Sequence, residues 1–172
     1  HLLAIGRKPM SIVDRLLSNN EVYAQGFSGP LPLPPSGHLA VVACMDARLD
    51  VSRVLGIAEG EAHVIRNAGG VVTDDVLRSL AISQHLLGTR EIVLIHHTDC
   101  GMLTFTDQGF RDDLEQQAGT RPSWASAAFT DLDADVRSSI ARIIADVHVP
   151  HKDSIRGFIF DVATGRLREV SA

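Results

Sequence analysis

Short runs rich in apolar residues recur along the chain and predict the strands of a buried sheet. Three candidate strands lie at residues 39–43, 63–67 and 91–95, of which the second and third also contain polar residues. The first reads Leu-Ala-Val-Val-Ala, and a run without polar positions is typical of a parallel strand covered on both faces. Two later runs, 155–160 and 167–170, flank a Thr-Gly pair and predict a hairpin.

Between the runs, apolar residues recur at helical spacing. Residues 73–88 begin with a capping Thr, carry two Asp in the first turn and end at Gly, all of which favour a helix. Residues 11–20 show a Ser and an Asp three positions later, a capping pattern, and the more polar stretches 107–117 and 131–147 predict further helices. Strands that alternate with helices predict an α/β fold with a central, mostly parallel β-sheet flanked by helices.

The predicted hairpin adds an edge strand at the C-terminal end, and the first helix belongs to an N-terminal arm. Residues 26–37 contain four of the seven prolines, which favours an extended segment over regular structure. We therefore expect a single domain over residues 1–172, in which 1–37 form a helical, proline-rich arm and 38–172 form the α/β core.

Charge and composition exclude several classes of partner. The net charge is −5 and the basic residues do not cluster, so nucleic acid and anionic membrane surfaces are not expected to bind. No apolar run is long enough to span a bilayer. The apolar residues 2–5 precede Arg7 and Lys8, the reverse of the order in a secretory signal, and we expect a cytoplasmic protein.

Both cysteines of the chain follow predicted strands. Cys44 comes directly after 39–43, and Cys100 follows 91–95 together with His97. Because the carboxyl ends of parallel strands form the ligand-binding edge of such a sheet, we expect these three side chains to meet there. A helical turn after the third strand would place His97 and Cys100 on one side. Three protein ligands with a fourth position open describe a catalytic zinc site.

Several alternatives to this ligand set stay open. Each cysteine, taken singly, is as typical of a buried core residue, and the two could also form a disulfide or a redox pair. His96 competes with His97, but neighbouring residues on a strand point to opposite faces, so only one is expected to reach the metal. The spacing to Cys100 favours His97.

Charged and glycine residues surround the same predicted edge. Asp46 and Arg48 can form two parallel hydrogen bonds, and the carboxylate so held could orient a zinc-bound hydroxide or fill the fourth zinc position itself. The paired Gly69 and Gly70, and Gly101, allow close approach of a ligand to the backbone. Each glycine is equally compatible with an ordinary tight turn.

Taken together, these residues resemble the β-carbonic anhydrases. The resemblance rests on Cys44-x-Asp-x-Arg48, on Arg66-Asn-Ala-Gly69 and on His97-x-x-Cys-Gly101, in this order, and it continues to the Asp161-x-x-Thr-Gly165 segment. The residues Ile57-Ala-Glu59 stand where plant-like members carry a Gln, and Ile82 where they carry a Tyr. The chain therefore resembles a short, divergent branch of the family.

The resemblance implies a lyase that carries one zinc ion per chain, bound by Cys44, His97 and Cys100. Asp46 and Arg48 are implied as the catalytic dyad. The implied reaction is the reversible hydration of CO2 to bicarbonate and a proton by attack of zinc-bound hydroxide, with the glycines near substrate. Homodimers or larger assemblies are implied as well. Alternatives on the same scaffold are a hydrolase of CS2 or COS and a non-catalytic module that is stabilised by zinc or senses bicarbonate.

Overall fold

The structure of the protein, a computed structural model, describes residues 11–171. The chain separates into two compact units, His1–Leu31 and Pro32–Ala172. The order of apolar and basic residues at positions 2–8, which bears on the expected location, lies outside the described residues. Within residues 11–171, no helix combines the length and the apolar character that crossing a bilayer requires.

The first unit contains the helix α1 (Ile12–Gln25). Ser11 caps it in the predicted way, because its hydroxyl accepts from the Asp14 amide at 3.1 Å and the Asp14 carboxylate accepts from the Ser11 amide at 3.0 Å. The helix extends five residues beyond the predicted end at Asn20. None of its residues is buried, although Leu16 and Leu17 lie together on one apolar face.

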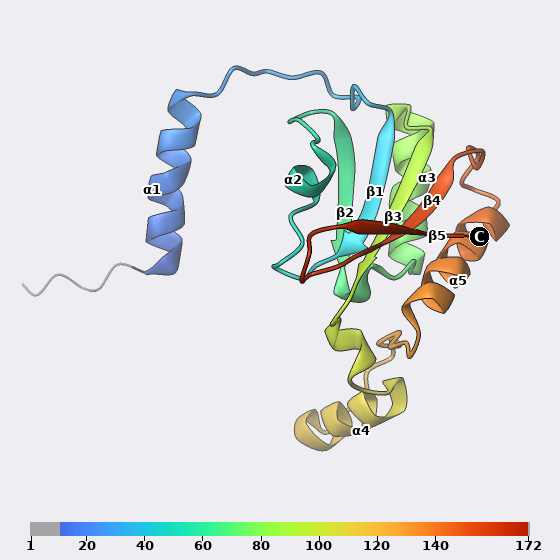
Figure 1. The fold of residues 1–172 in the computed structure, drawn as a ribbon. Helices are drawn as coiled ribbons and strands as arrows, with labels where there is room; N and C mark the ends of the chain where they lie inside the picture. Colours follow the sequence, from blue (N-terminus) through green and yellow to red (C-terminus); the bar gives the residue numbers. More distant parts are fainter. Residues whose placement is uncertain (1–10, 172) are drawn as a thin grey trace, which may run out of the picture. The chain divides into compact units, whose positions relative to one another are not determined.

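The second unit is built on a five-stranded sheet in the order β2-β1-β3-β4-β5 (Figure 1). The first four strands are parallel and the last is antiparallel, which confirms the predicted sheet and hairpin. The strands are β1 (Leu39–Cys44), β2 (Ala62–Asn67), β3 (Glu91–His97), β4 (Ile155–Phe160) and β5 (Leu167–Val170).

Both faces of the sheet are covered, as the apolar β1 predicted. On one face, Ala40 and Val42 pack with Leu80 of α3 (Asp74–Leu87) and Ile140 of α5 (Leu132–Ala145). On the other face, Val41 and Ala43 belong to a cluster that includes α2 (Val51–Leu55) and the short 3-10 helix η2 (Gly101–Leu103). Neighbouring residues of one strand thus serve two different cores.

The helices α3, α4 and α5 lie within two residues of their predicted boundaries. Thr73 caps α3, and Gly88 ends it in a left-handed conformation. Asp131 caps α5, and Thr106 caps α4 (Asp107–Ala118). The helix α2 was not predicted, because its five residues are too few to show a helical period. In Figure 1, α4 lies beyond the carboxyl end of β3.

Candidate metal centre

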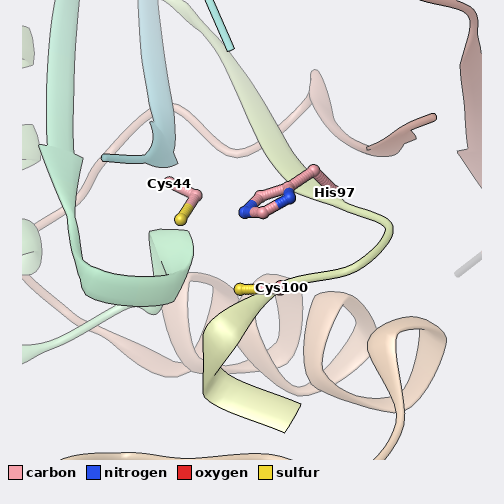
Figure 2. A group of neighbouring side chains, drawn as sticks. All are labelled: Cys44, His97 and Cys100. Atoms are coloured by element: carbon pink, nitrogen blue, oxygen red, sulfur yellow. The ribbon is translucent and has the colours of Figure 1, made fainter. Parts of the chain in front are cut away.

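Two adjacent parallel strands bring the predicted ligands together. β1 ends at Cys44 and β3 ends at His97, and the two strands are paired directly. The ligand atoms of Cys44, His97 and Cys100 all lie within 4.8 Å of one another, and the three residues are buried. Figure 2 shows both sulfur atoms and one edge of the His97 ring turned toward a common space.

The backbone that joins His97 to Cys100 differs from the expected helical turn. β3 continues through His96 and His97, which the prediction placed after the strand. Asp99 then adopts a left-handed conformation with φ of 53°, and Cys100 is extended. A single left-handed residue, rather than a helical turn, therefore returns the Cys100 sulfur toward the His97 ring.

The His97 ring is prepared to act as a ligand through one nitrogen. Its Nδ1 lies 2.9 Å from the Thr98 carbonyl oxygen, which can only accept, so the proton belongs on Nδ1. Its Nε2 is buried and has no hydrogen-bond partner among residues 11–171. An unpartnered buried nitrogen lone pair is costly, and coordination of a cation would satisfy it.

The two thiols also fit a cation. Donation from the Cys100 thiol lowers the pKa of Cys44 to about 4 against the opposing effect of burial, with smaller lowering contributions from the nearby His97 ring and from the amides of Asp46 and Gly69. The same hydrogen bond and burial raise the pKa of Cys100. The pair thus shares one proton and one negative charge, and a divalent cation can replace that proton and pair with two thiolates. The donor set of two sulfurs and one imidazole suits zinc.

Asp46 and Arg48 form the predicted ion pair with two parallel hydrogen bonds. The Arg48 Nε donates to Asp46 Oδ1 at 2.9 Å and Nη2 donates to Oδ2 at 2.8 Å. These bonds, with one from the Arg48 amide, hold the pKa of the Asp46 carboxyl well below its usual range. Asp46 Oδ2 lies 3.7 Å from His97 Nε2, which places the carboxylate beside the cluster.

Two further residues act on this loop, and the sequence did not indicate their roles. The guanidinium of Arg66 donates to the carbonyl oxygens of Cys44 at 3.0 Å and Asp46 at 2.8 Å. Asp99 accepts from Arg48, so the loops after β1 and β3 are joined. In the sequence, Arg66 stands out only as part of the Arg66-Asn-Ala-Gly69 motif. Asp99 is marked only by its position between His97 and Cys100.

The predicted glycines lie at different depths. Gly69 and Gly101 line a pocket next to the cluster. Gly70, with φ of 67°, lies behind it, where an added Cβ would be 2.7 Å from the Cys44 amide nitrogen. Gly70 therefore allows β1 and the Arg66–Gly70 segment to approach each other, and its role in binding substrate stays a prediction.

The pocket beside the cluster measures about 640 Å³ and is mostly apolar. Phe105 and Phe110 lie 5.2 Å apart between ring centroids, and Trp124 lies 6.4 Å from Phe110. The Asp107 carboxylate accepts from the Ser126 hydroxyl at 2.9 Å and so fastens the Trp124 segment to α4. Sequence reasoning missed this wall, because α4 is polar and its apolar residues are few.

His96, the competing ligand, points to the opposite face of β3. It is fully buried, and its Nε2 lies 2.6 Å from Asp135 Oδ2 at the start of α5. Its ring packs against Phe129 with the centroids 5.3 Å apart. The alternation along the strand thus separates the two histidines as expected, and only His97 faces the sulfurs.

Comparison with known proteins agrees with this geometry. A family model described as carbonic anhydrase matches residues 39–143. Beta-carbonic anhydrase 1 of Mycobacterium tuberculosis is 63% identical over 94% of this chain and 99% of its own length. The crystal structure of a carbonic anhydrase from Streptococcus mutans superposes with a TM-score of 0.89 at 44% identity, covering 95% of this chain and 100% of that one.

A carbon disulfide hydrolase of Saccharolobus solfataricus is also similar, at 34% identity over 80% of this chain and 79% of its own length. It is more distant than the mycobacterial relative. The match to the family model and the identity to the mycobacterial relative show that the chain belongs to the β-carbonic anhydrase family of enzymes.

Proposed function

We propose that the chain catalyses the reversible hydration of CO2 to bicarbonate and a proton, with one zinc ion held by Cys44, His97 and Cys100. The observation that carries this proposal is the buried cluster of three ligand atoms within 4.8 Å, one of them a nitrogen without a hydrogen-bond partner. Membership of the β-carbonic anhydrase family supports this reaction. The cluster supplies the place where the metal chemistry would occur.

The three proposed ligand residues would contribute differently to binding the cation. Cys44 and Cys100 would provide two negative charges, and His97 would bind as a neutral imidazole oriented by the Thr98 carbonyl oxygen. Arg66 fixes the two carbonyl groups of the Cys44 loop, so the sulfur of Cys44 is held in place. When zinc is bound, it lowers the pKa of a coordinated water to about 7 and makes a nucleophile available at neutral pH.

Asp46 would orient that nucleophile. Because the bonds from Arg48 keep its pKa low, Asp46 stays ionised at neutral pH and can only accept hydrogen bonds. A carboxylate that accepts a hydrogen bond from the O–H group of the nucleophile would fix which lone pair of the nucleophile's oxygen faces the substrate. Arg48 holds the carboxylate from behind, and it keeps the negative charge of Asp46 partly neutralised.

The apolar pocket would receive the substrate. CO2 carries no net charge and no dipole, so an apolar wall accepts it without loss of hydrogen bonds, whereas it offers little to the charged product. Cys44, His97 and Cys100 line this pocket, so a substrate bound in it would lie next to the cluster.

The reaction can be tested on protein whose zinc content has been measured. We expect stopped-flow CO2 hydration to scale with zinc content, to disappear after the metal is removed with a chelator, and to return when zinc is added back. Full zinc occupancy without CO2 turnover at neutral or alkaline pH would contradict the proposal.

A second candidate is hydrolysis of CS2 or COS. Two observations favour it: the 34% identity to a carbon disulfide hydrolase, and a pocket of about 640 Å³ lined mostly by apolar atoms, which suits the larger sulfur compounds. The same zinc-loaded sample decides between the two. Release of sulfide from CS2 with a higher kcat/KM than CO2 hydration would make the second candidate the main activity.

We also propose that the protein is a homodimer and that larger assemblies form from it. The support lies in α1, whose apolar face has no buried residue within this chain. A second copy that covers this face would remove apolar surface from water. A cytoplasmic location is proposed with it, because a reducing compartment keeps both thiols available as ligands.

The dimer predicts a specific effect of charge on α1. We expect Leu16→Glu with Leu17→Glu to halve the mass measured by light scattering, because two carboxylates would have to be buried. Ser18→Glu with Gln25→Glu places the same charge on the polar face and should leave the mass unchanged. A single-chain mass for the unaltered protein, or equal masses for both variants, would contradict the dimer.

A further inference from the structure

The guanidinium of Arg48 is shared between two carboxylates that come from different loops. Its Nε and Nη2 donate to Asp46, while its Nη1 donates to Asp99 Oδ2 at 2.8 Å. Nη2 also donates to the backbone carbonyl oxygen of Asp99 at 2.9 Å. The side of Arg48 that Asp46 leaves free is therefore occupied by the side chain and the backbone of one residue.

Asp99 is held in an unusual backbone conformation for this contact. It lies between His97 and Cys100, and its φ of 53° falls in the left-handed region, which costs most residues other than Gly, Asn and Asp. The same residue thus returns Cys100 to the cluster and presents two oxygen atoms to Arg48. An apolar residue here would provide neither function.

The contacts of Arg48 outside Asp46 come from Asp99, and solvent surrounds much of the rest of its side chain. Its side chain is long and 47% exposed, and among residues 11–171 its side chain forms hydrogen bonds with Asp46 and Asp99 alone. Asp46, in turn, lies 3.7 Å from His97 Nε2, close enough to compete for the position that water and substrate require. Whether Asp46 stays on Arg48 depends on whether Arg48 stays in place.

We propose that Asp99 is a positioning residue, which holds Arg48 so that Arg48 keeps Asp46 out of the fourth coordination position of the metal. This inference rests on the proposed zinc site. Asp99 and Asp46 bind mainly different N–H groups of Arg48, and Asp46 receives an additional bond from the Arg48 amide. The two carboxylates therefore support one arrangement, rather than competing for Arg48.

The test uses cobalt-loaded protein and azide, an anion that binds at an open metal position and changes the visible absorption. We expect Asp99→Gly, which suits the left-handed backbone, to weaken azide binding about 10-fold, because an open fraction of about one tenth raises the apparent Kd by that factor. The kcat/KM for CO2 should fall by a similar factor. Asp99→Asn keeps an oxygen acceptor and the backbone preference, and should restore most of both values.

The direction of the azide result separates positioning from charge. Removal of a carboxylate near the metal would by itself strengthen the binding of an anion, so weaker binding identifies Asp46 as the competitor. In an Asp46→Ala background, Asp99→Gly should no longer weaken azide binding. Asp75→Gly removes a similarly exposed partner of Arg78 and should leave azide binding unchanged.

Two results would overturn the inference. One is azide affinity and kcat/KM in Asp99→Gly equal to those of the unaltered protein. The other is an equal weakening of azide binding with and without Asp46, which would show that Asp99 acts by another route. Failure of the unaltered protein to bind cobalt or zinc would instead overturn the proposed function, and it is visible before any variant is compared.

Discussion

His97→Gln is expected to abolish zinc retention and CO2 hydration, whereas His96→Gln is expected to retain both. The two residues are neighbours on β3 and equally buried, but only the Nε2 of His97 faces the two sulfurs. A three-ligand site that loses one ligand retains two, which is too few for a tightly held catalytic zinc. We expect the zinc content of His97→Gln after dialysis to approach zero.

The His96 variant serves as the matched control. It loses the contact with Asp135 and should lower the free energy of unfolding by about 1–3 kcal/mol, the cost of an unpartnered buried group. Zinc content, stopped-flow turnover and urea unfolding are measured on both variants. Loss of zinc from both variants would indicate general unfolding. Loss of zinc from His96→Gln alone would show that the metal lies on the His96 face of the sheet and would contradict the proposed site.

Gly70→Ala is expected to lower the free energy of unfolding by about 4 kcal/mol, an unusually large effect for one methyl group. The added Cβ would lie 2.7 Å from the Cys44 amide nitrogen, 3.0 Å from the Ala43 carbonyl carbon and 3.1 Å from the Ile95 carbonyl oxygen. All three are backbone atoms of paired strands, which cannot move aside separately. The left-handed conformation adds about 1–2 kcal/mol.

Gly119→Ala isolates the backbone part of this cost. Gly119 has φ of 76°, and an added Cβ would meet no atom within 4 Å, so about 1–2 kcal/mol is expected. Urea unfolding of both variants in metal-free form gives the comparison. Equal costs at the two positions would mean that the strands around Gly70 can separate, contrary to their packing in the structure.

The parts of the fold that depend on local pattern were predictable from the sequence. The apolar β1, the capped α3 and the Ser11–Asp14 capping box each follow from residues within a few positions of one another. The predicted meeting of Cys44 with His97 and Cys100 followed from one general property, that parallel strands end at the same edge of a sheet. β3 was predicted too short because His96 and His97 are polar, although both are fully buried.

The parts that depend on contacts between distant residues were not predictable. Asp99 binds Arg48 across 51 positions, and Arg66 binds the Asp46 carbonyl across 20. No local pattern marks such pairs, because the side chains involved are as common on surfaces as in sites. The aromatic pocket wall is similar, since Phe110 belongs to a polar helix and contacts Trp124 only through the returning chain.

The placement of Cys44 on β1 and of His97 and Cys100 at the end of β3 has a consequence for the order of folding. The two strands are paired in the sheet but are separated in sequence by β2 and α3, so the ligand set is complete only after a long-range pairing has formed. A metal ion that needs all three ligands therefore binds after the slow step of folding. The binding energy of the proposed zinc ion would add to the barrier that the native protein must cross to unfold, so zinc would lengthen the lifetime of the folded state more than it would speed folding.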